Sequence, residues 1–174
     1  MILETKRLIL RTLTLADADE WFKILSDPES MKQYPNTLTM EQTIAWIEKN
    51  TLRYTKEGFG LWAAICKESN QFVGDCGITM QLIDGELVPE IGYHINRNHT
   101  GKGLATEAAI ACRDYAFNVL NLESIYSYMK YTNIGSYRVA EKNGMTLIKE
   151  YKDPINTLVK VYCITKEEFT NLNL

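Results

Sequence analysis

Two glycines precede a helical pattern in the middle of the chain, directly after a strand-like segment. The stretch reads Asn98-His99-Thr100-Gly101-Lys102-Gly103-Leu104-Ala105-Thr106-Glu107-Ala108 and joins residues 87–95 to a helix that we expect to end near Asn118. Glycine tolerates left-handed backbone angles and lets a ligand approach the main chain. The first amides of a helix lack intrahelical acceptors and lie at the positive end of its dipole. The stretch therefore predicts a loop that binds a pyrophosphate or a similar anion, with a plain tight turn as the alternative.

Two better-known phosphate motifs fit the sequence less well. A P-loop requires the pattern Gly-x-x-x-x-Gly-Lys-Ser/Thr, which does not occur in the chain. The dinucleotide fingerprint requires a third glycine where Thr106 stands and a parallel strand–helix–strand unit around it. Because the preceding strand here follows a predicted hairpin, a Rossmann dehydrogenase is disfavoured.

Composition restricts the function classes further. The 174 residues suit a single domain that spans residues 1–174. A net charge of −3 and a pI near 5.5 argue against a nucleic-acid partner, which usually meets a basic surface. The apolar start of the chain contains Glu4, Lys6 and Arg7, so it predicts neither a signal peptide nor a membrane span. We therefore expect a cytoplasmic protein with no membrane partner.

Cysteine and histidine residues are too few and too scattered to suggest a metal centre. The chain has no Cys-x-x-Cys pair, so we expect neither a zinc site nor a disulfide framework. The residues concerned are Cys66, Cys76, Cys112, Cys163, His94 and His99.

Alternation of apolar and polar residues predicts most of the strands. The expected strands lie at residues 3–13, 60–66, 72–82, 87–95, 124–131, 145–151 and 158–164. The turn signals at residues 68–70 and at Asp84-Gly85 favour an antiparallel meander that ends at the glycine loop. Pro89 cannot donate to a ladder, so we expect a bulge or a sheet edge at that position.

Capping residues and apolar spacing predict the helices. The helices are expected to begin at Thr14, Thr39, Leu104 and Asn133. Gly144 provides a left-handed stop for the last of them. If the strand after the third helix pairs in parallel with the strand before it, that helix is a right-handed crossover. The loop of residues 31–38 is a candidate for substrate selection, because loops often carry binding residues.

This order of elements, together with four stretches of sequence, resembles the GNAT superfamily of acetyl-CoA-dependent N-acetyltransferases. The stretches are Glu4-Thr5-Lys6-Arg7-Leu8-Ile9-Leu10-Arg11, Glu90-Ile91-Gly92-Tyr93, Gly101-Lys102-Gly103-Leu104-Ala105-Thr106-Glu107-Ala108, and Asn133 with Ser136, Glu141-Lys142 and Gly144. Within the superfamily, the chain is most similar to the branch that acetylates the N-termini of ribosomal proteins (RimJ/RimL type). The resemblance implies an α/β (α+β) fold with a mixed, mostly antiparallel sheet of about seven strands, about four helices, and a V-shaped splay between the fourth and fifth strands.

The same resemblance implies that acetyl-CoA binds as a cosubstrate and that no metal takes part. The family's pyrophosphate motif has Gln or Arg, two residues, Gly, one residue, then Gly or Ala. Gly103 and Ala105 match this motif, whereas Thr100 stands in place of Gln or Arg and is expected to weaken cofactor binding without abolishing it. The residues implied in cofactor binding are Ile91, Gly92, Tyr93, His94, Thr100, Gly101, Lys102, Gly103, Leu104, Ala105, Thr106, Asn133 and Ser136.

Three side chains are the candidates for catalysis. Glu90 is the best-placed carboxylate for a general base that acts through water. Ser136 matches the residue that the resembled branch places near the coenzyme sulfur, and Asn133 matches the position that hydrogen-bonds the pantetheine arm. For each, a structural role is the alternative: a solvent-facing glutamate, a first-turn serine and a helix cap. His94 is a further candidate base if it faces the cleft.

We interpret the chain as an enzyme that transfers acetyl by direct attack of a primary amine in a ternary complex, with the N-terminus of a protein, such as a ribosomal protein, as the acceptor. Backbone amides at residues 91–94 would polarise the thioester carbonyl. A small polyamine or an aminoglycoside is the alternative acceptor. A catalytically weak acetyl-CoA-binding module is the alternative class of protein. The oligomeric state stays open, with a homodimer common among similar proteins.

Overall fold

The computed structural model describes residues 2–154 and 157–172 of the chain. Eight strands in this part form one mixed sheet, in the order β1-β2-β3-β4-β5-β6-β8-β7. The strands are β1 (Leu3–Glu4), β2 (Leu8–Thr12), β3 (Leu61–Cys66), β4 (Phe72–Ile83), β5 (Glu86–Ile95), β6 (Ser124–Lys130), β7 (Thr146–Lys152) and β8 (Leu158–Thr165). The α-helices are α1 (Ala18–Leu25), α2 (Met40–Lys56), α3 (Leu104–Asn118), α4 (Ile134–Lys142) and α5 (Lys166–Leu172), and short 3-10 turns lie at Leu15–Asp17 and Arg97–His99.

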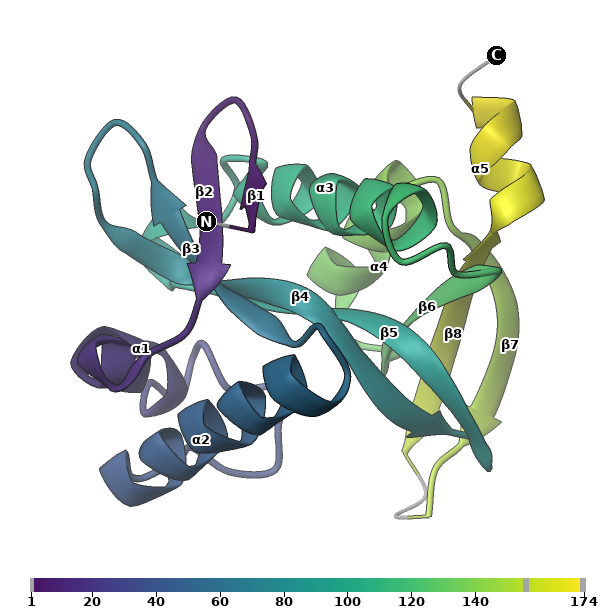
Figure 1. Cartoon of the computed structure of the whole chain (residues 1–174). Helices are drawn as coiled ribbons and strands as arrows, with labels where there is room; N and C mark the ends of the chain where they lie inside the picture. Colours follow the sequence, from purple (N-terminus) through teal and green to yellow (C-terminus); the bar gives the residue numbers. More distant parts are fainter. Residues whose placement is uncertain (1, 155–156, 173–174) are drawn as a thin grey trace.

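Helices cover both faces of the sheet, with α1 and α2 on one side and α3 and α4 on the other (Figure 1). On the first side, Trp21, Ile24 and Ile47 belong to one buried apolar cluster with Leu61 and Ala63 of β3. The predicted capping box opens α2: the Gln42 N–H donates to the Thr39 hydroxyl, and the Thr39 N–H donates to the Gln42 side chain. This face of the sheet therefore lies under two helices that local sequence signals position.

Helix α3 lies close to the opposite face because its inward residues are small. Ala108, Ala109, Cys112 and Ala116 are each at most 1% exposed, and they share a core cluster with the inner face of β4 and β5. The Sγ atoms of Cys76 and Cys112 are 3.6 Å apart, and both thiols are free. The close approach fixes the start of α3 next to the strands that form the site.

The hairpin between β4 and β5 has the register that its turn predicts. Asp84 and Gly85 both have positive φ, as a two-residue hairpin turn requires, and the pairing runs without interruption from Ile83 and Glu86 outward. Pro89 pairs with Met80 in this unbroken register, so the expected bulge there is wrong. The strand tolerates proline because β5 pairs with its other neighbour at a single position, which leaves that side close to an edge.

The splay predicted between the fourth and fifth expected strands occurs between β5 and β6. These two strands run parallel and pair only at Glu90 and Tyr126, so they diverge on either side of that contact. The Ser127 hydroxyl lies 3.4 Å from the Ile91 carbonyl oxygen across the same junction. A parallel pair joined by α3 is the arrangement that the crossover prediction required.

Two elements differ from expectation. The strand expected over residues 3–13 is broken into β1 and β2 by a turn, because the Thr5 hydroxyl accepts the Leu8 N–H at 2.9 Å. Helix α5 was not anticipated; it begins where Thr165 and Glu168 exchange hydrogen bonds between side chain and backbone. None of the described helices is long and apolar enough to cross a bilayer.

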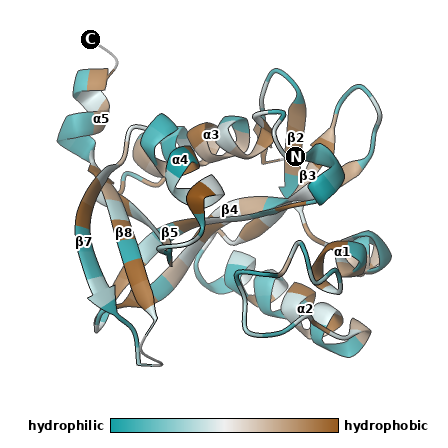
Figure 2. Cartoon of the chain, turned by 180° about the vertical axis from the view of Figure 1, so that it is seen from behind, coloured by the Kyte–Doolittle hydropathy of each residue, from teal (hydrophilic) through white to brown (hydrophobic). Residues whose placement is uncertain are grey.

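The sheet ends at β7, whose later residues are charged. Hydrophilic colour follows the second half of this strand in Figure 2, where Lys149, Glu150 and Lys152 lie. Lys149 pairs with Asp84 of the β4–β5 turn, and Lys160 of β8 pairs with Glu150. Charges of this kind discourage further strand addition at an exposed edge.

Candidate active site

The glycine loop presents a row of backbone amides at the start of α3. Gly101 and Gly103 have φ of 73° and 77°, and Gly103 is the N-cap of the helix with no side-chain capping bond. The first helical hydrogen bond of α3 is the one that the Glu107 N–H donates to the Gly103 carbonyl. Within the described residues, the amides from residue 101 to 106 therefore have no protein acceptor, and they fit a phosphate group.

Thr100, the departure from the family motif, serves the turn that precedes the loop. Its hydroxyl donates to the Arg97 carbonyl at 2.8 Å, and its N–H donates to the same oxygen at 3.2 Å. The side chain thus closes the Arg97–His99 turn, and the anion-binding capacity of the loop rests on its amides.

A hydrogen-bond network ties the N-terminal turn to this loop. The Glu107 carboxylate accepts from the Thr5 hydroxyl at 2.6 Å, the Arg7 N–H at 2.7 Å and the Arg7 Nε at 2.6 Å. Arg7 Nη1 also donates to the Lys102 carbonyl at 2.8 Å. Burial raises the pKa of Glu107, but the bonds from Thr5 and Arg7 outweigh it and lower that pKa overall. These bonds fix the N-terminal turn against the glycine loop and the start of α3.

Two adjoining cavities lie beside β5 and share part of their lining. The first, of about 450 Å³, is lined by the glycine loop, by α4 and by the loop before α2. The second, of about 390 Å³, is lined by α2, by β5 and by β6. Six residues line both cavities: Gln33, Tyr34, Tyr93, His94, Asn133 and Ser136. We name them the cofactor cavity and the acceptor cavity, and the six shared residues mark their junction.

The cofactor cavity suits a ligand that carries phosphates. Besides the glycine loop it is lined by Arg138 and Lys142 of α4, and the described residues offer neither of them an ion pair. Of the predicted loop residues, Thr100, Gly101, Gly103, Leu104, Ala105 and Thr106 line this cavity. Lys102 is not among its lining residues, and its carbonyl oxygen instead accepts from Arg7.

Glu90 is buried on β5 at the floor of the acceptor cavity. It is 7% exposed, and burial raises its pKa to about 7, although His94, Thr79 and Arg53 act in the opposite direction. The solvent-facing alternative for this glutamate is therefore wrong. A carboxyl group with a pKa near neutrality can accept and release a proton under physiological conditions.

His94 lines the junction, and its backbone and ring are hydrogen-bonded to the carboxylate of Asp75, a residue that the sequence analysis does not identify. Asp75 on β4 is fully buried; its Oδ1 accepts the His94 N–H at 2.9 Å and lies 2.9 Å from His94 Nδ1. The predicted use of backbone amides to hold the thioester carbonyl must exclude this N–H, because Asp75 already accepts it. Ile91, Gly92 and Tyr93 keep their candidate roles, and all three line the acceptor cavity.

Asn133 and Ser136 lie at the junction and are tied into the start of α4. The Asn133 Oδ1 accepts the Ser136 N–H at 3.3 Å, which is the helix cap foreseen as its structural alternative. The Tyr93 hydroxyl donates to the Ser136 carbonyl at 2.9 Å and connects β5 to the helix. Both side chains line both cavities, so the cap also places them where a cofactor arm would pass.

Comparison with known proteins agrees with this geometry. The family model described as "Acetyltransferase (GNAT) domain" matches residues 7–146. YkkB of Bacillus subtilis (strain 168) is 38% identical over 157 residues, covering 88% of this chain and 91% of that protein. The N-acetyltransferase p20 of Bacillus licheniformis is 34% identical over 171 residues, covering 92% of each.

A solved structure is similar over almost the whole chain. The crystal structure of a GNAT-family acetyltransferase from Bacillus anthracis superposes with a TM-score of 0.82 and 29% identity, covering 96% of this chain and 99% of that one. This chain belongs to the GNAT family of acetyl-CoA-dependent N-acetyltransferases.

Proposed function

We propose that the acceptor is the N-terminal amine of a peptide or protein whose first residues include carboxylates. The observation that carries this proposal is the charge around the acceptor cavity. Lys49 and Arg53 of α2 and Lys130 of β6 line it, and the described part of the chain gives none of the three an ion pair. Because Arg53 already acts on the charge of Glu90 and bonds Asn50, Lys49 and Lys130 are the cations that favour an acceptor with negative groups near its amine.

The carboxylates of the acceptor cavity are too few for a polycation. Among the described residues, Glu90 and Asp153 are the carboxylates that line it, and Glu90 is partly uncharged near neutral pH because burial raises its pKa to about 7. A polyamine or an aminoglycoside carries several ammonium groups, each of which needs a carboxylate or loses hydration without compensation. The cavity therefore favours a peptide over these alternatives.

The residues at the junction have distinct roles in the proposed reaction. The thioester supplies an acyl carbon and a thiolate leaving group. Amides of the glycine loop hold the pyrophosphate, and Asn133 and Ser136 contact the arm and the sulfur. Glu90 takes a proton from the acceptor ammonium through a water molecule, so that the amine can attack directly. The loop of residues 31–38 selects the acceptor, since Gln33 and Tyr34 line the junction.

A matched set of acceptors tests the proposal. Two peptides of equal length begin with Ser and continue with either three Asp or three Lys residues, and spermidine and an aminoglycoside complete the set. We expect kcat/KM for the acidic peptide to exceed that for the basic one by about tenfold or more, since each charge contributes on the order of 1 kcal/mol near a surface. Release of free coenzyme A and mass spectrometry of the product measure the rate.

A pair of variants on one helix assigns the preference to the cavity. Lys49→Glu should lower the acidic-to-basic ratio, whereas Lys56→Glu, an equal charge change on α2 outside the cavity lining, should leave it near the wild-type value. Transfer to spermidine or the aminoglycoside alone would replace the peptide by the alternative acceptor. A rise in melting temperature with acetyl-CoA but no acetylated amine would indicate a binding module.

A further inference from the structure

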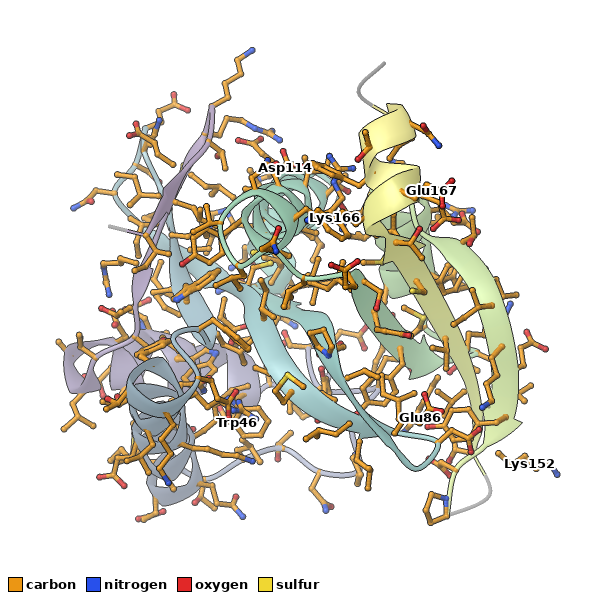
Figure 3. The ribbon with its side chains drawn as sticks, turned by 45° about the vertical axis from the view of Figure 1, so that its right-hand side comes forward. Trp46, Glu86, Asp114, Lys152, Lys166 and Glu167 are labelled. Atoms are coloured by element: carbon orange, nitrogen blue, oxygen red, sulfur yellow. The ribbon has the colours of Figure 1, made fainter. Side chains whose placement is uncertain are left out.

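A ladder of polar pairs crosses β4 and β5 on the face that α2 covers. Asp75 pairs with His94, Gly77 with Gly92, and Thr79 with Glu90. Residues two apart on a strand share a face, so Glu90 and His94 lie on one side of β5, with Gly92 between them. Figure 3 shows Trp46 between α2 and the sheet, and its ring lies edge-on to the His94 ring at 6.2 Å.

Hydrogen bonds to the Asp75 carboxylate fix the position of His94. An ionised carboxylate that is fully buried needs hydrogen-bond partners, because its desolvation is costly. Both partners that the structure shows for Asp75 come from one residue: the His94 N–H at 2.9 Å, and His94 Nδ1 at 2.9 Å from Oδ1 and 3.2 Å from Oδ2. Tyr34 flanks the His94 ring with centroids 5.2 Å apart. The ring therefore has one orientation.

This orientation decides which nitrogen is available. When Nδ1 donates its hydrogen to Asp75, the neutral ring carries its lone pair on Nε2, on the side away from the carboxylate. Burial lowers the pKa of His94, but the charge and the hydrogen bond of Asp75 outweigh it and raise that pKa above the ordinary 6.5. The lone pair on Nε2, and not a particular pKa, is what makes this ring available for proton transfer.

Glu90 and His94 differ in their access to the cavities. Glu90 lines the acceptor cavity alone, whereas His94 lines both cavities. Among the other residues of the junction, Tyr34 and Tyr93 have pKa values raised far above neutrality by burial, and the Tyr93 hydroxyl already donates to Ser136. His94 is therefore the junction residue best suited to move a proton from one cavity to the other.

The proposed reaction needs two proton transfers. The acceptor ammonium has three N–H bonds and the amide product has one; a C–N bond forms, the C–S bond breaks, and one of the two released protons ends on sulfur. We infer that Glu90 takes the first proton and passes it to solvent, while His94, oriented by Asp75, carries the second from nitrogen to the departing sulfur. The inference rests on the proposed acetyl transfer and adds His94 as a catalytic residue and Asp75 as a positioning residue.

Other charged groups surround the pair and belong in any account of its pH dependence. Asp75 and Tyr34 face His94 from β4 and from the loop before α2, and the charge of Glu90 acts on it from the same strand. Around Glu90 the acceptor cavity adds Lys49 and Arg53 from α2, Tyr128 and Lys130 from β6, and Asp153. Asp75 is the one that touches the His94 ring through a hydrogen bond, so its replacement isolates the effect on that ring.

The test compares His94→Gln and Glu90→Gln with two acetyl donors and two acceptor amines. With acetyl-CoA, His94→Gln should lower kcat about a hundredfold, within the range of general acid–base catalysis. With S-phenyl thioacetate, whose aromatic thiolate leaves without a proton, the loss should shrink below about tenfold. The Glu90→Gln defect should persist with both donors and shrink with an acceptor amine of low pKa, which needs no base before attack.

Asp75→Asn provides the second test, through the pH profile. One limb of the pH profile of kcat should be absent in His94→Gln and is thereby assigned to His94. Removal of the Asp75 charge lowers the His94 pKa, so in Asp75→Asn this limb should move to lower pH. The KM for acetyl-CoA should not change. A structural defect alone would lower kcat equally at all pH values. Cys76→Ala, in the same strand but facing α3, controls for altered packing and should keep the wild-type rate.

The outcomes separate this inference from the proposed function. If the wild-type protein acetylates no amine, the proposed function fails. If it acetylates amines but His94→Gln loses the same factor with both donors, or if Asp75→Asn leaves the limb in place, the proton relay through His94 is wrong and acetyl transfer stands. Circular dichroism of each variant confirms that it is folded before its rate is compared.

Discussion

Gly92 lies between Glu90 and His94 on β5, and its lack of a side chain leaves room for the Glu90 carboxylate. A Cβ built at this position would lie 3.1 Å from Glu90 Oε2 and 3.6 Å from Leu61 Cδ2. We expect Gly92→Ala to fold, because a shift of a few tenths of an ångström relieves the contact, and to lower kcat about tenfold by displacing the carboxylate. General-base catalysis depends on hydrogen-bond distance to this extent.

Steady-state kinetics and urea denaturation of Gly92→Ala together check this expectation. A lower kcat with a free energy of unfolding within about 1 kcal/mol of wild type would assign the loss to the site. An unchanged kcat would show that the Glu90 carboxylate can move without consequence, and the role of Gly92 would then be packing alone.

The sequence predicts some of the residues of the site but not all of them. Glu90 and His94 are recognisable because a family motif and a glycine loop surround them. Asp75 was missed, since it is 19 residues from His94 in the chain and no motif includes it. The signal was present in the hairpin: counting back from the Asp84-Gly85 turn places Asp75 opposite His94 and Thr79 opposite Glu90.

Among the elements, the turn between β1 and β2 is bonded to the start of α3 through Glu107 and to the glycine loop through Lys102. The ion pair of Arg7 and Glu107 is partly exposed, at 45% and 19% of the two side chains, so its strength is on the order of 1 kcal/mol. We expect Arg7→Ala to weaken acetyl-CoA binding by about threefold to tenfold, because the Lys102 carbonyl loses its anchor. Isothermal titration calorimetry measures the change.

Lys23→Ala is the matched control for Arg7→Ala. It also removes one exposed ion pair, between Lys23 and Glu20 on α1, which lies on the other face of the sheet. Its affinity for acetyl-CoA should equal that of the wild type. If both variants bind acetyl-CoA equally well, the turn between β1 and β2 stabilises the fold but not the loop.

Most elements followed from local signals, and the exceptions have physical reasons. Capping pairs predict the helices and the Asp84-Gly85 turn predicts the hairpin, because each of these structures is formed by residues that are close in the sequence. The break between β1 and β2 depends on Thr5, whose hydroxyl bonds both the Leu8 N–H and the distant Glu107. A contact between residues far apart in the chain produces no periodic pattern in the sequence, so the pattern of residues does not predict it.

For the whole molecule, Glu90 is a source of instability as well as a candidate base. Its pKa rises from 4.5 to about 7 on folding, so the folded state favours the protonated form and resists ionisation. The destabilisation that comes from ionising Glu90 is absent below the unfolded pKa, grows as pH rises from 4.5, and is complete above about 7. It amounts to at most about 3 kcal/mol, at 1.36 kcal/mol per pKa unit.

Glu90→Gln should therefore be more stable than the wild type at pH 8 and nearly equal to it at pH 4.5. Urea denaturation at the two pH values measures the difference in free energy of unfolding. Glu86→Gln is the control, since Glu86 is exposed on the same strand (Figure 3) and its replacement should change stability at neither pH. A Glu90→Gln protein that is less stable than wild type at pH 8 would mean that the ionised carboxylate is well solvated.

The bonds from Thr5 and Arg7 to Glu107 join positions roughly a hundred apart in the chain. Figure 1 shows the consequence: the N-terminal strands lie against the start of α3, while α5 ends at the far side of the molecule. For protein engineering, the two ends of this chain are not equivalent. We expect an affinity tag or fusion partner ahead of β1 to disturb the glycine loop, and one behind α5 to leave that loop unchanged.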